Sequence, residues 1–213
     1  MKTAIFSDVH GNIIALKQFL EAVREQVQSY ICLGDIVNYG PWNDQCLQTI
    51  VELPNCTILE GNHERLFLGT ENLSNEIRLV QDFFQVSYGY FERKDLISSL
   101  PQYLDLGDFR CIHTINHRSV YPDSNITVDR NFIIGHSHYQ FSIRRSGCTI
   151  INPGSIGQNR KWINRVEFAV FDTETQHADF SSIEYDVDAF ISELVDRDYP
   201  RSCIDYYKSK PRN

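Results

Sequence analysis

The sequence predicts an α/β protein, with one domain in which two packed sheets are flanked by helices. Over the first 60 residues, short apolar runs alternate with segments of helical periodicity, the pattern typical of α/β folds. After Leu100-Pro101 the chain changes to short β-rich runs separated by turn residues. With 213 residues, the chain can bury a core of its own. We therefore expect a single domain over 1–198 and a polar, loosely held C-terminal tail over 199–213.

Apolar runs and their spacing predict the first elements in order. Ala4-Ile5-Phe6 stops abruptly at Ser7-Asp8, as a strand buried on both faces does. Residues 12–28 then carry apolar side chains three and four positions apart, which is one helical face, and Asn12 stands at the N-cap position. A strand over 29–33, a helix over 43–52 and a strand over 56–59 follow.

The rest of the chain is predicted to be rich in strands and to end in a helix. Between residues 64 and 100 the periodicity is helical but mixed, and no strand is predicted. Apolar positions in 187–196 share one helical face. The β-rich runs lie at 103–106, 109–114, 129–134, 139–145, 148–152, 165–172 and 178–184.

Composition and charge exclude several classes of protein. The 42% hydrophobic and 23% charged content excludes collagen-like and mostly disordered chains, and a net charge of −8 argues against an extensive nucleic-acid surface. No apolar run approaches the ~20 residues that span a bilayer. The chain opens without a secretory pattern, and its six cysteines form no Cys-x-x-Cys. We expect reduced thiols and a cytoplasmic location.

Polar clusters follow directly after the predicted strands, where ligands bind in α/β folds. Carboxylates, imidazoles and amide oxygens together suit borderline divalent metals. Taken alone, Asp8 and His10 could be ordinary strand-end residues, and His136 and His138 a structural pair on one face of an extended segment. The clusters are Asp8-Val9-His10-Gly11-Asn12, Gly34-Asp35, Gly61-Asn62-His63-Glu64, His113, Gly135-His136-Ser137-His138 and Asn152-Pro153-Gly154-Ser155.

In this order and spacing, over residues 3–155, the clusters resemble those of the calcineurin-like metallophosphoesterases, specifically their small single-domain prokaryotic branch. The resemblance implies a four-layer α/β/β/α sandwich with two mixed sheets. It also implies a metal-dependent phosphoesterase in which a hydroxide held by two metal ions attacks the phosphorus directly. The expected substrate is a small phosphoester or nucleotide, and the expected cofactors are two divalent transition-metal ions (Mn, Fe, Ni, Co or Zn), with Mn favoured.

The family pattern also assigns the individual residues. One metal would take Asp8, His10 and His138. The other would take Asn62, His113 and His136, with Asp35 bridging both. His117 competes with His113, because it lies four residues later in the same loop.

Catalytic and substrate roles fall to the neighbouring residues. His63, next to Asn62, would face the phosphate and either protonate the leaving group or stabilise its charge. The expected substrate contacts are Asn12 (first a helix cap), Asn62, His117, Arg118, Tyr121 and Arg160. Glu64 and Arg65 are expected to open a helix, in either a solvated or a capping role, and His177 is expected to be exposed in a hairpin.

One motif departs from the related protein serine/threonine phosphatases. They read Asp-Arg-Gly where this chain has Asn38-Tyr39-Gly40. The missing arginine removes a phosphate-gripping fork, so a phosphodiester is the favoured substrate. The missing aspartate removes the carboxylate that orients the catalytic histidine in those relatives and leaves a neutral Asn38, so His63 is expected to be a weaker acid here. The alternatives are a phosphomonoesterase, a nucleotide pyrophosphatase, or a non-catalytic scaffold, which the presence of His63 and all the ligand positions disfavours.

Overall fold

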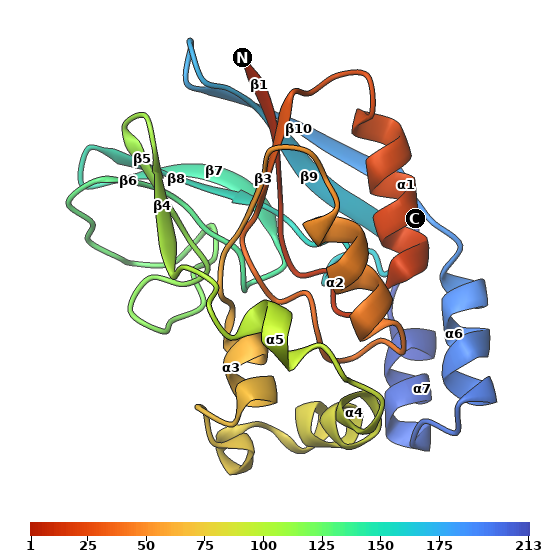
Figure 1. The fold of residues 1–213 in the computed structure, drawn as a ribbon. Helices are drawn as coiled ribbons and strands as arrows, with labels where there is room; N and C mark the ends of the chain where they lie inside the picture. The colour runs from red at the N-terminus through yellow and green to blue at the C-terminus, as the bar shows by residue number, and fades with distance from the viewer.

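Two five-stranded mixed sheets form the centre of the fold in the computed structural model, which describes residues 1–213 (Figure 1). Sheet A has the strand order β10-β9-β1-β2-β3, with β1, β2 and β3 parallel to one another. Sheet B has the order β4-β5-β6-β8-β7, with β5, β6 and β8 parallel. Sheet A contains β1 (Lys2–Phe6), β2 (Ser29–Cys32), β3 (Cys56–Ile58), β9 (Arg165–Asp172) and β10 (His177–Glu184). Sheet B contains β4 (Tyr103–Leu106), β5 (Phe109–Ile112), β6 (Asn131–Ile133), β7 (Gln140–Arg145) and β8 (Cys148–Pro153).

The helices gather on the side of sheet A that faces away from sheet B and at one end of the molecule (Figure 1). None of them is both long and apolar enough to cross a membrane. They are α1 (Ile13–Val23), α2 (Asn43–Val51), α3 (Asn62–Leu68), α4 (Arg78–Gly89), α5 (Lys94–Ile97), α6 (Val187–Asp196) and α7 (Arg201–Ser209), with a 3₁₀ turn at Leu73–Asn75.

Alternation along the strands divides the core into layers. In β1, Ala4 and Phe6 join the large cluster beneath the helices, whereas Ile5 points the other way, into the interface between the sheets. In β8, Ile151 belongs to that interface and Ile150 to the outer face of sheet B. The irregular segment 114–130 covers this outer face. The predicted fold of two mixed sheets flanked by helices is therefore confirmed.

The C-terminal region corrects one expectation. Residues 201–209 form helix α7, with Cys203 and Tyr207 fully buried, where a loose polar tail had been expected. The last residues are held as well, because Arg212 makes a bidentate ion pair with Asp188, and Asn213 exchanges hydrogen bonds with the side chain of Asn164. A polar composition did not exclude a helix that buries one face.

Candidate metal centre

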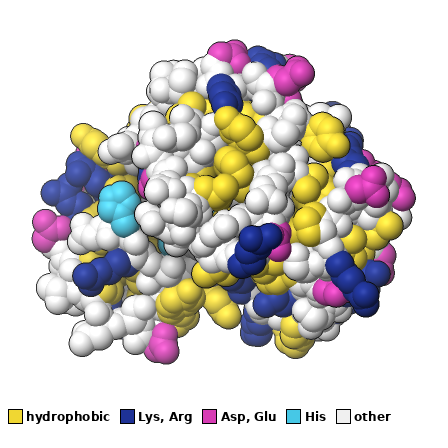
Figure 2. Space-filling model, turned by 90° about the horizontal axis from the view of Figure 1, so that it is seen from below, with side chains coloured by type: hydrophobic (Ala, Val, Ile, Leu, Met, Phe, Trp, Pro, Cys, Tyr) yellow, Lys and Arg dark blue, Asp and Glu magenta, His cyan; other side chains and the backbone are white.

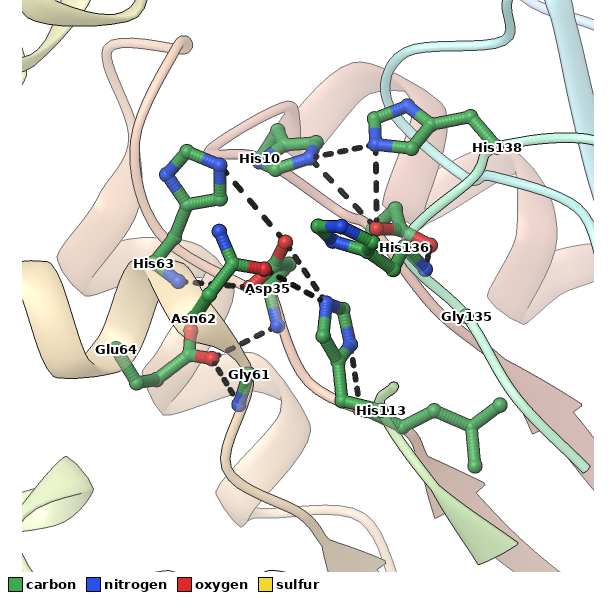
Figure 3. A network of polar contacts seen from close by, with 12 residues as sticks. His10, Asp35, Gly61, Asn62, His63, Glu64, His113, Gly135, His136 and His138 are labelled. Atoms are coloured by element: carbon green, nitrogen blue, oxygen red, sulfur yellow. Dashed lines mark hydrogen bonds and ion pairs between the residues drawn. The ribbon is translucent and has the colours of Figure 1, made fainter. Parts of the chain in front are cut away.

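The loops that leave the strands of both sheets hold several polar residues in left-handed backbone conformations. Asp8, His10, Asp35, His136 and His138 all have φ between 50° and 67°. Residues other than glycine adopt such values rarely, and those that do cluster at functional sites. Here the sharp turns bring side chains from sheet A and from sheet B to one point (Figure 3).

One group of side chains consists of Asp8, His10 and His138, all buried. His10 Nδ1 lies 3.1 Å from the Val37 carbonyl oxygen, and His138 Nδ1 lies 2.7 Å from that of Gln158. A carbonyl only accepts, so both Nδ1 atoms carry a hydrogen, and in the neutral rings both Nε2 atoms present a lone pair. The two Nε2 atoms lie 3.3 Å apart, and His138 Nε2 lies 3.2 Å from Asp8 Oδ1.

The second group is built in the same way around Asp35, His113 and His136. His113 Nδ1 donates to the Leu33 carbonyl oxygen at 2.9 Å. Its Nε2 atom lies 3.0 Å from Asp35 Oδ2 and 3.1 Å from Asn62 Oδ1. The His136 ring lies edge-on to that of His113, with centroids 5.3 Å apart. Asp35, His10 and His63 form a third set of atoms close enough to share an ion.

In these contacts, ring nitrogens lie beside carboxylate oxygens. A cation bound between them can be ligated by both atoms. Asp8 Oδ1 and Asp35 Oδ2 are buried and accept no hydrogen bond. The Nε2 atoms of His138 and His113 face these two oxygens, and such a contact is costly inside a protein unless a cation or a proton lies between the two atoms. Metal-bound histidines commonly donate their other ring N–H to a backbone carbonyl, as His10, His113 and His138 do here. The donor set therefore fits divalent metal ions.

The pKa values follow from this crowding. Burial lowers the pKa of His113, but the carboxylate of Asp35 outweighs burial and raises it to about 9. Burial opposes ionisation of Asp35, yet His113 and His63 hold the pKa of its carboxyl well below the usual value. Burial and the charge of His113 lower the pKa of His136 to about 4. Without metal, the centre thus favours an ionised Asp35 and a protonated His113. A metal ion can take the place of the proton on His113.

His63 lies beside this centre at the start of α3. Its backbone N–H donates to Asp35 Oδ1 at 2.9 Å, and its Nε2 atom lies 3.8 Å from Asp35 Oδ2. Its Nδ1 atom lies 2.9 Å from the amide nitrogen of Asn38. The predicted placement of Asn38 near His63 corresponds to a direct contact.

Glu64 is fully buried, so the expected solvated role is wrong, and its structural role is larger than a helix cap. Its buried carboxylate accepts backbone N–H groups from the N-cap residue Gly61 and from Asp35 at 2.8 Å, and from Ile36 and Val37 at 2.8 and 3.3 Å. Burial raises the pKa of this carboxyl to about 7. A Cβ atom at Gly61 would collide with Asp35 Oδ1, so glycine allows α3 to approach the loop after β2. Only the capping part of this role has a local signal in the sequence.

A cavity of about 530 Å³ opens onto the centre. Its lining includes Asp35, Asn62, His63, His136 and His138, together with Tyr39, Tyr121, His117, Arg65 and Arg160. Arg65 pairs with Glu60 and Glu71, whereas Arg160 has no carboxylate partner.

On the face shown in Figure 2, a histidine is exposed, and Lys or Arg side chains are interspersed with Asp or Glu.

Not every expected substrate contact lies in this cavity. Asn12 uses its side-chain oxygen to cap α1 at Ala15 and its amide nitrogen to donate to the Gly157 carbonyl, and it does not line the cavity. Arg118 is exposed and does not line it either. His117 lies exposed at the rim, so His113, and not His117, reaches the centre. His177 is exposed in the β9–β10 hairpin, as predicted.

Comparisons with known proteins place these observations in a family. A sequence model of the calcineurin-like phosphoesterase superfamily domain matches residues 1–176. Protein MJ0912 of Methanocaldococcus jannaschii is 26% identical, over 92% of this chain and 93% of its own. The crystal structure of a metallophosphoesterase from Sphaerobacter thermophilus superposes with a TM-score of 0.80 at 24% identity, over 98% of both chains. That of protein PH1004 from Pyrococcus horikoshii gives 0.79 at 16% identity, over 97% of both.

Proposed function

This chain belongs to the calcineurin-like phosphoesterase superfamily and is a hydrolase of phosphoester bonds, and on that basis we propose that it cleaves a small phosphodiester with the help of two divalent metal ions. One ion would bind to Asp8, His10 and His138, and the other to Asn62, His113 and His136, with Asp35 shared between them. The mixed oxygen and nitrogen donors suit transition metals, with manganese favoured. Bound ions of this kind supply Lewis-acid activation of water and neutralise charge on the phosphoryl group.

The observation that carries this proposal is the convergence of imidazole Nε2 atoms on buried carboxylate oxygens. His138 Nε2 and Asp8 Oδ1 are 3.2 Å apart, and His113 Nε2 and Asp35 Oδ2 are 3.0 Å apart. Without a cation or a proton between them, these contacts would be repulsive. One member of each pair, His138 and Asp35, lines the cleft that would hold the substrate.

The chain's own side chains would hold and orient the ester. His63 lines the cleft beside Asp35 and can donate a hydrogen bond from Nε2 to a phosphoryl oxygen. Arg160 can pair with the phosphoryl charge, because no carboxylate of the protein occupies its guanidinium. Asn62 contributes its amide oxygen to His113 and the centre.

A phosphomonoester or nucleotide is the second candidate substrate, and Arg160 favours it. The sequence lacks the arginine of the Asp-Arg-Gly motif, which argues for a diester. The unpaired Arg160 in the cleft could replace that arginine and grip a dianionic phosphate. A comparison of the two ester classes on the same preparation decides between them.

The test is metal-dependent turnover by purified protein. With Mn²⁺ present, we expect hydrolysis of bis(4-nitrophenyl) phosphate, slower hydrolysis of 4-nitrophenyl phosphate, and loss of both with a chelator. His138→Gln should abolish turnover, whereas His177→Gln, which changes an exposed histidine far from the cleft, should not. Absence of metal-dependent turnover across diesters, monoesters and nucleotides would instead support a scaffold role.

A further inference from the structure

We propose that Asn38, fixed by the backbone of Tyr39 and by Ser87, positions His63 as a hydrogen-bond donor to the phosphoryl group, so that His63 does not transfer a proton to the leaving group. This inference rests on the proposed phosphoesterase function and specifies the role of one residue in the same site. The supporting observation is the direction of the hydrogen bonds that the buried side-chain amide of Asn38 makes.

The partners of the Asn38 side chain distinguish its oxygen from its nitrogen. The backbone N–H of Tyr39 lies 2.7 Å from one terminal atom of the amide, which must therefore be the accepting oxygen. The other terminal atom is then the NH₂ group, and it lies 2.9 Å from His63 Nδ1. Asn38 is fully buried and His63 is 5% exposed, so water does not compete for this contact.

Ser87 of α4 contacts the same amide oxygen, whose identity the Tyr39 N–H fixes. Its hydroxyl lies 2.7 Å from the Phe83 carbonyl oxygen and 3.1 Å from Asn38 Oδ1. Both are acceptors, so the single hydroxyl hydrogen is shared between them. A flipped Asn38 amide would place its NH₂ group against the Tyr39 N–H, donor against donor. The amide is therefore held with its NH₂ group toward His63.

The rings around His63 restrict its rotation. Tyr39 lies edge-on to it, with centroids 5.3 Å apart, and His10 lies edge-on at 4.9 Å. Tyr39 in turn packs on Phe83 at 4.8 Å. The ring is thus fixed in position, and its second nitrogen, Nε2, faces the side of Asp35 that forms the centre.

The direction of the Asn38 bond decides what His63 can do. A ring nitrogen that accepts a hydrogen bond carries no hydrogen, so Nδ1 is bare and the hydrogen is on Nε2. If Nε2 gave up that hydrogen during the reaction, the ring would be left as an anion. His63 therefore keeps its hydrogen and donates it in a hydrogen bond to a phosphoryl oxygen, and the leaving oxygen takes its proton from water.

The first test reads the ring nitrogens directly. The protein is labelled with ¹⁵N-histidine and loaded with diamagnetic Zn²⁺, and its ring nitrogens are observed by long-range ¹H–¹⁵N correlation, with His63→Gln for assignment. We expect Nδ1 of His63 to appear as an unprotonated acceptor and Nε2 as protonated. Asn38→Asp, which replaces the donor by an acceptor, should move the hydrogen to Nδ1. A wild-type spectrum with hydrogen on Nδ1 overturns the proposal.

The second test compares leaving groups. His63→Ala should lose the same factor, about 10²-fold, on an alkyl ester and on a nitrophenyl ester, since a phosphoryl contact is indifferent to the leaving group. Asn38→Gly suits the left-handed backbone at φ 72° and removes the amide together with its Cβ atom. It should lower kcat about tenfold on both esters with KM little changed. Ser87→Ala should have a smaller effect in the same direction.

Two matched variants serve as controls. Asn55→Gly makes the same change at an exposed asparagine with φ 53°, and Ser202→Ala removes a hydroxyl that bonds to Asp82. Both should keep the wild-type kcat. A loss for His63→Ala at least tenfold greater on the alkyl ester would show proton transfer and overturn the proposal. If no ester is turned over, the proposed function fails, yet the nitrogen spectrum still reports how His63 is held.

Discussion

Three histidines of the centre share one construction, in which Nδ1 donates to a backbone carbonyl and Nε2 faces acidic or amide oxygens. His10, His113 and His138 belong to this set, and their carbonyl partners are Val37 and Leu33 in the loop after β2 and Gln158 in the loop after β8. The backbone thus sets the tautomer of each ring before any ion arrives. Bringing these electron-rich atoms together lowers the free energy of unfolding of the metal-free protein. Because a bound cation removes their repulsion, the same arrangement increases the affinity for the cation.

Asp35 is the residue whose loss should affect both proposed ions. A bridging carboxylate offsets the repulsion between two dications, so Asp35→Asn should lower the metal content from about two per chain to one or less. Elemental analysis after purification from manganese-supplemented medium measures this. Asp105→Asn, which changes an exposed carboxylate on sheet B, is the control and should keep the wild-type content. Unchanged stoichiometry in Asp35→Asn would refute the bridging role.

His113 should make the stability of the metal-free protein depend on pH. Its pKa is raised from 6.5 to about 9 in the folded protein, because Asp35 outweighs burial. The folded state therefore binds a proton that the unfolded chain lacks between these values. This contribution to stability is complete below pH 6.5 and is lost as the pH rises through 9. Denaturant unfolding after chelation should show a decline from pH 7 to 9.5 that His113→Gln reduces.

At the scale of elements, helix α7 closes the core beneath α4 and α6. The fully buried Tyr207 ring packs on Phe190 with centroids 4.8 Å apart and on Phe83 at 6.0 Å. Ser202 donates a hydrogen bond to Asp82 of α4. A helix with these contacts contributes to the stability of the whole domain.

Truncating Tyr207 tests the role of α7. Removing a buried aromatic ring from a core costs about 3–5 kcal/mol, so Tyr207→Ala should lower the melting temperature on the order of 10 °C. Lys208→Ala changes the exposed neighbour on the same helix and should be nearly neutral. Thermal unfolding followed by circular dichroism compares the two. Similar melting temperatures for both variants would mean that α7 is dispensable.

The sequence predicts the elements that repeat a local pattern and misses contacts made between distant segments. The strand ends and their polar residues are local, so Asp8, Asp35 and His113 could be singled out in advance. The four N–H groups on Glu64 come from two loops, and no single stretch of sequence contains them. In α7, Cys203 and Tyr207 lie four positions apart, which is the spacing of one helical face, and both are buried. The polar residues between and around them kept this spacing from predicting a helix.

At the scale of the whole molecule, the two sheets can fold without metal, because three apolar clusters fill the interface and both outer faces. Metal should still stabilise the native state by mass action. At 100 times the dissociation constant, one bound ion adds about 2.7 kcal/mol if it binds only the folded protein. Chelation should therefore lower the melting temperature and leave the circular dichroism spectrum at 25 °C unchanged. A collapse of that spectrum would show that the centre is structural.

The division of the centre between the sheets also has a consequence for how the protein is made. Asp8, Asp35 and Asn62 follow strands of sheet A, whereas His113, His136 and His138 follow strands of sheet B. A growing chain that has emerged from the ribosome only as far as residue 100 offers neither group its full set of donors. Strand β9, which joins β1 in the middle of sheet A, is synthesised later still. Capture of the proposed ions would therefore wait until synthesis has passed residue 138, and a product terminated before that point would lack donors from sheet B.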